Sequence, residues 1–396
     1  MKEIGIGVIG TGFMGKAHSI AYSASASVFG TGLRPRLEMV CDLSPERAQI
    51  RAADLGFSRY SSDWREVVND PAVELISVCT PNDTHAEISI AALAAGKHVW
   101  CEKPMSTTLT DSAAMRDMAI NSSAKTIIGY NYTKNPAVTH ARRLIEEGHI
   151  GRVSGFFCRY DVDNEADGSR PWSWRMSRDK SGTGANGDVL SHVISVGHYL
   201  TGSTISKVVG DIAIIHQQRA DADNPDSQKT VDNDDMVSAL VTFANGVKGH
   251  IGASRVTWGR KCGLRWEIHG TEGTILYDQE RLNELKLFIK DTDAGDSGTG
   301  DSGAAIAGFR TILTGPQHPP YSAFLPNGGH SLGYMDVKIC ELHELLTAIE
   351  SDKPVWPNFD DGLAIENVMD AVDRSALSGQ WVEVGKLLGG TNDAKH

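Results

Sequence analysis

Residues 4–15 read IGIGVIGTGFMG, a short apolar run that ends in the glycine pattern G-x-G-x-x-G. The run predicts a strand, and the stretch from about Met14 to Ala24 predicts a helix. In such a unit the first glycine permits a tight turn, the second lets the backbone approach a pyrophosphate, and the helix N-terminus offers free N–H groups to the anion. We therefore expect four residues of this turn to bind a dinucleotide: Gly10, Gly12, Phe13 and Met14.

An acidic residue follows the second predicted strand. That strand runs from Leu37 to Cys41, and Asp42 comes next. A carboxylate there can accept hydrogen bonds from the adenosine ribose and repels a 2′-phosphate, so we expect NAD, with NADP disfavoured. The alternative is a helix-capping acid, but Ser44 and Pro45 already supply a cap and a first helical residue. The long interval before Asp42 is assigned to a loop from Ser25 to Pro35.

Strand and helix patterns continue to alternate up to residue 130. The expected elements are a helix from Pro45 to Leu55, a strand from Leu75 to Val78, a helix from His85 to Ala95, a strand from His98 to Cys101, a helix near Thr108 to Asn121 and a strand from Thr126 to Tyr130. This alternation predicts a doubly wound parallel sheet, which binds ligands beyond the carboxyl ends of its strands. The residues expected there are Thr80, Pro81, Asn82, Glu102, Lys103, Asn131 and Tyr132.

The chain is too long for one hydrophobic core, because it has 396 residues. Apolar and more polar residues alternate from Val237 to Phe243, as in strands with two different faces. We expect a dinucleotide-binding Rossmann domain over residues 1–130 and a substrate-binding and oligomerisation domain over residues 131–396. Two stretches, Ala220 to Asp235 and Asp291 to Gly303, are expected to be solvated loops.

Composition narrows the class of partner and compartment. The net charge is −12, and no basic stretch offsets it, which argues against nucleic acid or an anionic membrane as partner. No apolar run approaches the roughly 20 residues of a membrane span. The six cysteines are scattered without a CxxC pair, and a strand begins too early to leave room for a signal peptide, so we expect a cytoplasmic protein. No His, Cys and Asp cluster has metal-ligand spacing, so no metal is expected.

A glycine-rich approach leads into a helix that carries an acid and an imidazole. Residues 182–187 read GTGANG, and apolar residues then recur at helical spacing at Val189, Val193, Val196 and Leu200. Asp188, His192 and Ser195 are expected together on another face of this helix. A carboxylate and an imidazole one turn apart can reach one substrate, and imidazole titrates near neutrality. For any isolated pair the alternative, a helix-start acid with a core histidine, would be favoured.

The order of these motifs resembles the Gfo/Idh/MocA family (glucose-fructose oxidoreductase, inositol dehydrogenase, rhizopine catabolism) along nearly the whole chain. The stretches that carry the resemblance are GTGFMGKAH (10–18), CTPNDTH (79–85), CEKP (101–104), GYNYTKNPAV (129–138), PWSWR (171–175), GTGANGDVLSH (182–192), ERLNEL (280–285), GPQHPPY (315–321), GHSLGYMD (329–336) and WVEV (381–384).

The resemblance implies a fold and an activity. The fold is an α/β Rossmann domain followed by an α+β domain with a large open, mostly antiparallel sheet, of which one face lines the substrate pocket. The other face often packs against a second subunit, so a homodimer or homotetramer is expected. The implied activity is NAD-dependent hydride transfer between nicotinamide and a ring hydroxyl or ketone of a sugar, anhydrosugar or inositol-type polyol.

The resemblance also assigns roles to residues. The lysine of the EKP motif holds the reacting hydroxyl, the histidine acts as general base and the aspartate binds or polarises, which implies catalytic Lys103, His192 and Asp188. Arg175 and His85 are expected near the cofactor, although His85 could instead cap its helix. The remaining expected substrate contacts are Trp174, for which packing is an equally good account, and His318 and His330.

Two alternatives remain open, and one residue departs from the pattern. Some relatives use NAD transiently to cleave glycosides, and one branch is a non-catalytic NAD- or sugar-sensing regulator, which would be expected to lose parts of the Lys/Asp/His set. Many family members carry Asp where this chain has Ser195. This departure bears on the identity of the substrate more than on the class of reaction.

Overall fold

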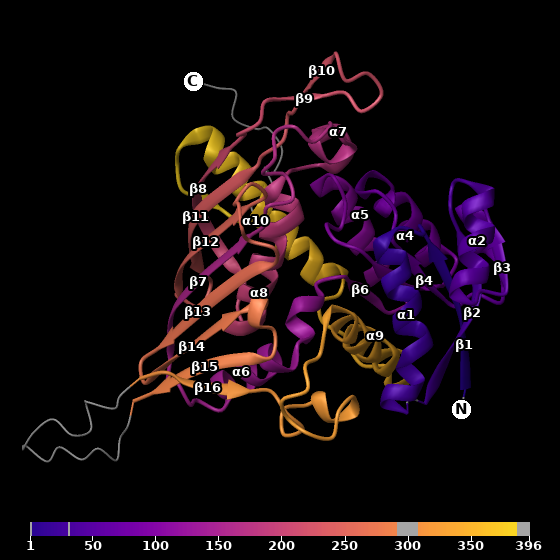
Figure 1. Cartoon of the computed structure of the whole chain (residues 1–396). Coiled ribbons are helices and arrows are strands. Elements are labelled where there is room, and N and C mark those ends of the chain that lie inside the picture. The colour runs from indigo at the N-terminus through magenta and orange to yellow at the C-terminus, as the bar shows by residue number, and fades with distance from the viewer. Residues whose placement is uncertain (1, 31, 291–307, 386–396) are drawn as a thin grey trace, which may run out of the picture.

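The computed structural model describes residues 2–30, 32–290 and 308–385, and shows two large sheets with helices between and around them (Figure 1). The first sheet has the order β3-β2-β1-β4-β5-β6, and every pairing in it is parallel. Its strands are β1 (Lys2–Ile9), β2 (Leu33–Cys41), β3 (Arg59–Ser61), β4 (Leu75–Val78), β5 (His98–Cys101) and β6 (Thr126–Ile128). The helices that follow them are α1 (Phe13–Phe29), α2 (Pro45–Leu55), α3 (Trp64–Asn69), α4 (His85–Ala94) and α5 (Leu109–Ile120).

This order confirms the predicted doubly wound sheet. The chain winds outward from β1 through β2 to β3 and then returns to place β4 on the other side of β1. The carboxyl ends of β1 and β4 therefore border a switch point, where such sheets bind their ligands.

The second sheet is large, open and mostly antiparallel, as expected. Its order is β16-β15-β14-β13-β7-β12-β11-β8-β17, and among the described strands of this sheet only β7 and β12 pair in parallel. The strands are β7 (Val153–Asp161), β8 (Ile205–Ala213), β11 (Met236–Phe243), β12 (Lys248–Ser254), β13 (Gly263–Gly270), β14 (Gly273–Asp278), β15 (Glu284–Ile289), β16 (Arg310–Leu313) and β17 (Val382–Glu383), with a separate hairpin of β9 (Gln218–Ala220) and β10 (Gln228–Thr230).

Helices join the two sheets. α6 (Pro136–Glu146), α8 (Ser191–Thr201) and α10 (Phe359–Ser378) pack on strands of the second sheet, and α10 also packs against α5 (Figure 1). α9 (Tyr334–Ser351) comes late in the chain, yet it packs against α1 of the Rossmann domain. Apolar residues of α9 share a cluster with Ile4, Ile6 and Trp100 of the parallel sheet. One face of the first sheet is thus covered by a helix from the second half of the chain, and the boundary at residue 130 stays a prediction.

Two loop predictions need correction. The stretch from Ser25 to Pro35 is not one loop, because α1 continues to Phe29 and β2 begins at Leu33. Pro35 is tolerated inside β2 because β3 pairs only with Met39–Cys41, so among the described residues no strand lies on that side of Pro35. The stretch from Ala220 to Asp235 is solvated only in part, because its last three residues are buried. The loop expected from Asp291 to Gly303 lies outside the described residues.

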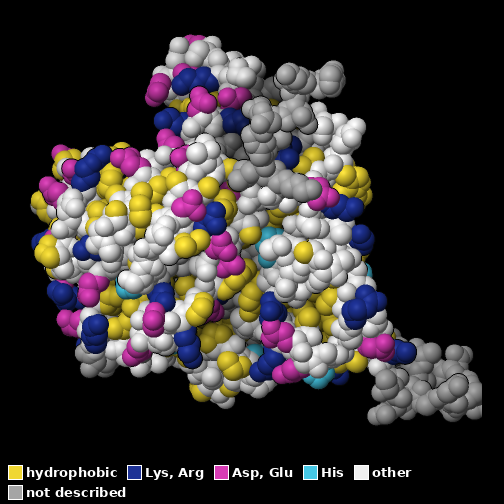
Figure 2. All heavy atoms as spheres, turned by 180° about the vertical axis from the view of Figure 1, so that it is seen from behind, with side chains coloured by type: hydrophobic (Ala, Val, Ile, Leu, Met, Phe, Trp, Pro, Cys, Tyr) yellow, Lys and Arg dark blue, Asp and Glu magenta, His cyan; other side chains and the backbone are white. Residues whose placement is uncertain are grey.

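The molecular surface mixes charges of both signs. Figure 2 shows the face opposite to that of Figure 1, where Lys and Arg side chains lie among Asp and Glu side chains. Such a mixed surface does not generate the field of one sign that attracts polyanions. Among the described residues, no helix is long and apolar enough to cross a membrane.

Candidate active site

In the turn after β1, each glycine position has a different structural role. Gly10 has φ +93°, and a Cβ there would lie 2.4 Å from the backbone oxygen of Cys79 at the end of β4. A Cβ at Gly15 would lie 1.9 Å from the oxygen of Gly10, so the helix packs closely on the turn. A Cβ at Gly12 would meet nothing within 4 Å, and no side chain caps the N-terminus of α1 there. The turn therefore leaves open space and free N–H groups beside a helix start, which fits a pyrophosphate.

Asp42 is buried beside this turn and held from two sides. One carboxylate oxygen accepts hydrogen bonds from the N–H (3.3 Å) and the hydroxyl of Thr11, and the other accepts from Arg47 Nε at 2.8 Å. Burial alone would raise the pKa of Asp42, but the hydrogen bonds from Arg47 and Thr11 outweigh it and lower the pKa. Asp42 is therefore a fixed anion at the end of β2, as a ribose-binding residue requires. The long interval in the sequence between the turn and Asp42 is explained by α1, which is longer than the predicted helix.

A single cavity of about 880 Å³ joins the two halves of the molecule. It runs from the glycine turn to the second sheet, and a cavity of this size suits a cofactor and a small ligand. All but two of the residues expected at the site line it: Gly10, Gly12, Phe13, Met14, Asp42, Thr80, Pro81, Asn82, His85, Glu102, Lys103, Asn131, Tyr132, Trp174, Arg175, Asp188 and His192.

Lys103 and Asp188 form an ion pair in the wall of this cavity. Lys103 follows β5 and precedes Pro104, and the Lys103–Pro104 peptide bond is cis. Its Nζ lies 2.8 Å from Asp188 Oδ1 and donates to the Asp188 backbone oxygen at 2.7 Å. Burial would raise the pKa of Asp188, but the nearby ammonium of Lys103 outweighs it and holds that pKa well below its usual range. The pair thus presents a cation and an anion together in one wall.

His192 stands in an aromatic box next to that pair. Its ring lies 4.6 Å from the ring of Tyr132, 5.5 Å from Tyr130 and 5.8 Å from Tyr160, measured between centroids. Burial lowers the pKa of His192 well below its ordinary value, and the ammonium of Lys103 lowers it further. Among the described residues, His192 Nδ1 has no hydrogen-bond partner. A neutral imidazole with a free nitrogen at a cavity can accept a proton.

Asp188 and His192 do not belong to one regular α-helix. Residues Asn186–Leu190 form a wide π-helical turn, and α8 begins at Ser191. The wide turn changes how the later residues face relative to Asp188. Ser195 is fully buried and does not line the cavity, so it does not reach the site that Asp188 and His192 line.

Two family models and several relatives match this chain. An oxidoreductase family model with an NAD-binding Rossmann fold matches residues 4–130, and a GFO/IDH/MocA C-terminal domain model matches residues 138–276. Levoglucosan dehydrogenase of Pseudarthrobacter phenanthrenivorans is 37% identical over 98% of this chain and 100% of that protein. Inositol 2-dehydrogenase of Rhizobium meliloti is 26% identical over 96% and 98%.

The chain belongs to the GFO/IDH/MocA family. A solved structure of levoglucosan dehydrogenase in complex with NADH and levoglucosan has a TM-score of 0.91 and 38% identity, covering 97% of this chain and 100% of that chain. The same protein in complex with NADH and L-sorbose gives the same TM-score of 0.91. The chain is therefore an NAD-dependent oxidoreductase of the sugar and polyol dehydrogenase type, as its sequence predicted.

Two residues that are expected to contact the cofactor, His85 and Asn82, also form hydrogen bonds within the protein. His85 lies between two backbone oxygens, with Nδ1 2.9 Å from Pro104 and Nε2 2.9 Å from Thr80. It therefore ties the segment after β4 to the segment that carries Lys103. Asn82 Nδ2 donates to the backbone oxygen of Ser181, which also lines the cavity, at 3.0 Å. Both residues line the cavity, so cofactor contact stays a prediction for each.

The structure places His318 and His330 away from this cavity. Neither lines it, although His318 is buried. His318 Nδ1 accepts the N–H of Gly315 at 3.0 Å, and its ring lies 4.4 Å from that of His140. His330 is exposed, and its backbone oxygen accepts the hydroxyl of Tyr321. Their loop is thus organised by its own contacts, and the expected substrate contacts are not brought together with Lys103.

A buried charge cluster beneath the EKP motif escaped the sequence reasoning. Glu102 Oε1 lies 2.9 Å from His18 Nε2 and 2.6 Å from Lys338 Nζ, and Lys338 also donates to Glu341 at 2.8 Å. His18 and Lys338 are fully buried, and His18 stacks on Trp100. His18 ends the motif GTGFMGKAH and could have been suspected from it. Lys338 gave no signal, because a lysine on a helix is normally exposed.

Opposing effects set the charges of this cluster. Burial would raise the pKa of Glu102, but the neighbouring ammonium of Lys338 and the hydrogen bond with His18 hold it well below its usual range. Burial would lower the pKa of Lys338, and Glu102 and Glu341 raise it above its ordinary value. Burial lowers the pKa of His18 to about 4. An anion next to Lys103 is thus balanced by a cation from α9.

Proposed function

We propose that this enzyme oxidises a ring hydroxyl of an anhydrosugar of the levoglucosan type, with NAD⁺ as hydride acceptor. One observation carries the proposal: the Lys103–Asp188 ion pair and the neutral His192 stand in the same cavity as the glycine turn and Asp42. The choice of anhydrosugar is supported by the levoglucosan dehydrogenases, which match nearly the whole chain at 37–38% identity. An inositol-type polyol is the second candidate, supported by the more distant inositol dehydrogenase.

The Rossmann half would hold the dinucleotide. Gly10 and Gly12 let the backbone approach its pyrophosphate, and Asp42 would accept hydrogen bonds from the adenosine ribose. When bound, NAD⁺ supplies the acceptor for the hydride that leaves the sugar carbon. Asn131 is buried at the cavity with its Nδ2 lacking a partner among the described residues, so it has a donor to offer to a ligand.

The second half would hold the sugar and move its proton. His192 accepts the proton of the reacting hydroxyl, because it is neutral and has a free nitrogen. The ammonium of Lys103 stabilises the negative charge that develops on that oxygen. Asp188 holds Lys103 in place through the 2.8 Å ion pair and has a second oxygen for a neighbouring hydroxyl. Tyr132 and Trp174 add aromatic surface to the cavity wall.

Assembly and compartment are part of the same proposal. On the face of the second sheet away from the cavity, Phe157 and Leu240 are 42% and 52% exposed. Exposed apolar side chains on an open sheet favour burial against another subunit, so we propose a homodimer or homotetramer. The six scattered cysteines favour a reducing compartment, and we propose the cytoplasm.

Formation of NADH by the purified protein tests the proposal. NAD⁺ is offered with levoglucosan, with aldoses, with inositols and with glycosides, and the series is repeated with NADP⁺. An increase in NADH absorbance with NAD⁺ and levoglucosan is the expected result. An increase with inositols alone would favour the second candidate, an inositol-type polyol. Release of sugar from a glycoside without net NADH would favour a glycosidase. Absence of any reaction, with NAD binding confirmed, would favour a sensor.

A further inference from the structure

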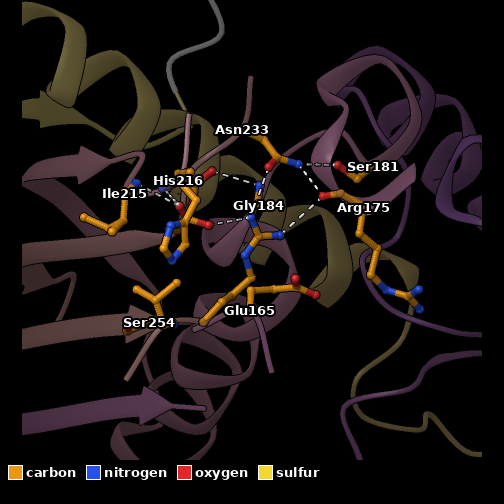
Figure 3. A network of polar contacts seen from close by, with 12 residues as sticks. Glu165, Arg175, Ser181, Gly184, Ile215, His216, Asn233 and Ser254 are labelled. Carbon is orange, nitrogen blue, oxygen red and sulfur yellow. Dashed lines mark hydrogen bonds and ion pairs between the residues drawn. The ribbon is translucent and has the colours of Figure 1, made fainter. Parts of the chain in front are cut away.

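A three-residue segment between β10 and β11 lies in the interior instead of in solvent. Asn233, Asp234 and Asp235 are 1%, 2% and 2% exposed, although the sequence around them is polar and turn-rich. Buried carboxylates and amides are stable only when hydrogen bonds compensate for lost water. Figure 3 shows the polar network around this Asn233–Asp235 segment, which extends from the β-sheet to the segment that carries Arg175.

Asp234 caps the helix that leads to the catalytic residues. Its Oδ1 accepts the N–H of Gly184 at 2.8 Å, and its Oδ2 accepts the N–H of Asn186 at 2.7 Å. Its backbone oxygen accepts the intervening N–H of Ala185 at 2.8 Å. N–H groups at a helix start have no partner within the helix, and a negative charge there is favourable. A residue 48 positions away from Asn186 in sequence therefore supplies the cap.

The close approach of Asp234 depends on the glycine-rich sequence before the helix. A Cβ at Gly184 would lie 1.8 Å from the backbone oxygen of Asp234, so no larger residue fits there. On the other side, the Asn186 side chain donates to the backbone oxygen of Met369 and to Asp373 Oδ1, both at 3.0 Å. The start of the helix is thus held between Asp234 and α10.

The neighbours of Asp234 hold other parts of the same cavity wall. Asn233 Nδ2 donates to the backbone oxygen of Arg175 at 2.6 Å and to Ser181 Oγ at 2.8 Å. The buried Arg255, which lines the cavity, donates to Asn233 Oδ1 and Asp235 Oδ1, both at 3.1 Å. In Figure 3 the guanidinium of Arg175 points away from this network, whereas its backbone oxygen points into it.

We infer that Asp234 is a positioning residue for the reaction, because its carboxylate holds the helix start that places Asp188 against Lys103 and His192 beside them. Asp188 comes two residues after Asn186, so rotation or fraying of the helix start would shift its carboxylate directly. The Lys103–Asp188 contacts of 2.7 and 2.8 Å leave little tolerance for such a shift. Asp234 itself does not line the cavity.

The test compares Asp234→Asn with the matched control Asp232→Asn. Asp232 is an exposed neighbour that accepts the N–H of Arg178 and holds no part of the catalytic helix. The kinetic arm rests on the proposed function and uses NAD⁺ with levoglucosan. For D234N we expect kcat to fall about 10-fold to 100-fold, because small misplacements of catalytic groups are costly. The KM for NAD⁺ should stay within about twofold, because the Rossmann half is untouched. D232N should match the wild type.

Hydrogen–deuterium exchange of the unliganded proteins supplies a readout that needs no substrate. Faster exchange of residues 184–192 in D234N, with unchanged exchange of the glycine turn, is expected. Unchanged exchange, or a kcat loss that D232N shares, would overturn the inference. If D234N does not fold, D234S, which keeps one acceptor oxygen, takes its place, and failure of both to fold would assign Asp234 to stability alone and overturn it. A wild type without NADH formation would remove the proposed function, while the exchange result would still show whether Asp234 holds the helix.

Discussion

Replacing Lys338 by Met should destabilise the folded protein strongly at neutral pH. The ammonium is fully buried and binds two buried carboxylates, Glu102 at 2.6 Å and Glu341 at 2.8 Å. Met fills nearly the same volume without the charge, so the two carboxylates lose the cation that they share, and Glu102 keeps only its contact with His18. Removing one partner of a buried pair costs about 3–5 kcal/mol, because the remaining charge stays desolvated. Because the entropy of unfolding of a 396-residue chain corresponds to roughly 1.2 °C per kcal/mol, the expected fall in Tm is roughly 4–6 °C.

The pH dependence distinguishes a charge effect from a packing effect. Burial already raises the pKa of Glu341 to about 7 in the wild type, whereas Lys338 holds the pKa of Glu102 well below its usual range. In the variant, burial and mutual repulsion should raise the pKa of Glu102 above the value of about 4.3 in the unfolded chain and raise the pKa of Glu341 further. A group whose folded pKa is raised destabilises the fold above that pKa and ceases to do so as it takes a proton. The difference in unfolding free energy between wild type and variant should therefore shrink as the pH falls from about 7 to about 5.

Urea unfolding followed by tryptophan fluorescence measures this difference. Trp100 reports on the site directly, because Lys338 Nζ lies 5.3 Å from its ring centroid. Lys353→Met is the matched control, since Lys353 is exposed just after α9 and should unfold like the wild type. A loss below about 1 kcal/mol at pH 7, the scale of an exposed ion pair, would refute the reasoning. So would a difference of constant size from pH 7 to pH 5.

Three further outcomes are expected at the site itself. Lys103→Met should lower kcat by about 10²-fold to 10³-fold, while NADH binding, followed by its effect on fluorescence, stays as in the wild type. Turnover within tenfold of the wild type would remove Lys103 from the mechanism. Because burial lowers the pKa of His192, kcat/KM for the sugar should stay constant as the pH falls through 6.5 and decline only at lower pH. A midpoint at or above 6.5 in the pH–rate profile would contradict a neutral buried base. Asp42→Ala should raise the KM for NAD⁺ and weaken the preference for NAD⁺ over NADP⁺, because the carboxylate that repels a 2′-phosphate is gone and Arg47 is released. An unchanged ratio of the kcat/KM values for NAD⁺ and NADP⁺ would show that Asp42 does not select the cofactor.

The candidate active site was predictable where chemistry follows directly on a regular element. Lys103 comes at the end of a buried strand, and Asp188 and His192 follow a glycine-rich turn, so each could be singled out by position. The structure adds that Lys103 and Asp188 form an ion pair, although 85 residues separate them. The predicted shared face of Asp188, His192 and Ser195 assumed regular helical spacing, which a π-helical turn over Asn186–Leu190 interrupts.

Short polar loops were the least predictable part of the chain. A turn-rich stretch that ends at Asp235 suggests solvent, yet its last residues are buried because backbone N–H groups from the catalytic helix need acceptors there. The histidines at 318 and 330 show the opposite case. Their motifs suggested the pocket, but local contacts with Gly315 and Tyr321 engage them elsewhere.

The amino-acid sequence alone determined the parallel sheet and the dinucleotide turn, because these depend on periodicity and on residues adjacent to strand ends. The family resemblance added the prediction that Lys103, Asp188 and His192 are the reacting groups. Only the tertiary structure decided which distant residues hold those groups in place. Lys338 reaches Glu102 across 236 residues, and Asp234 reaches Asn186 across 48. Such pairings carry no local signal, since a buried charge looks like an exposed one in the sequence until folding removes the water around it.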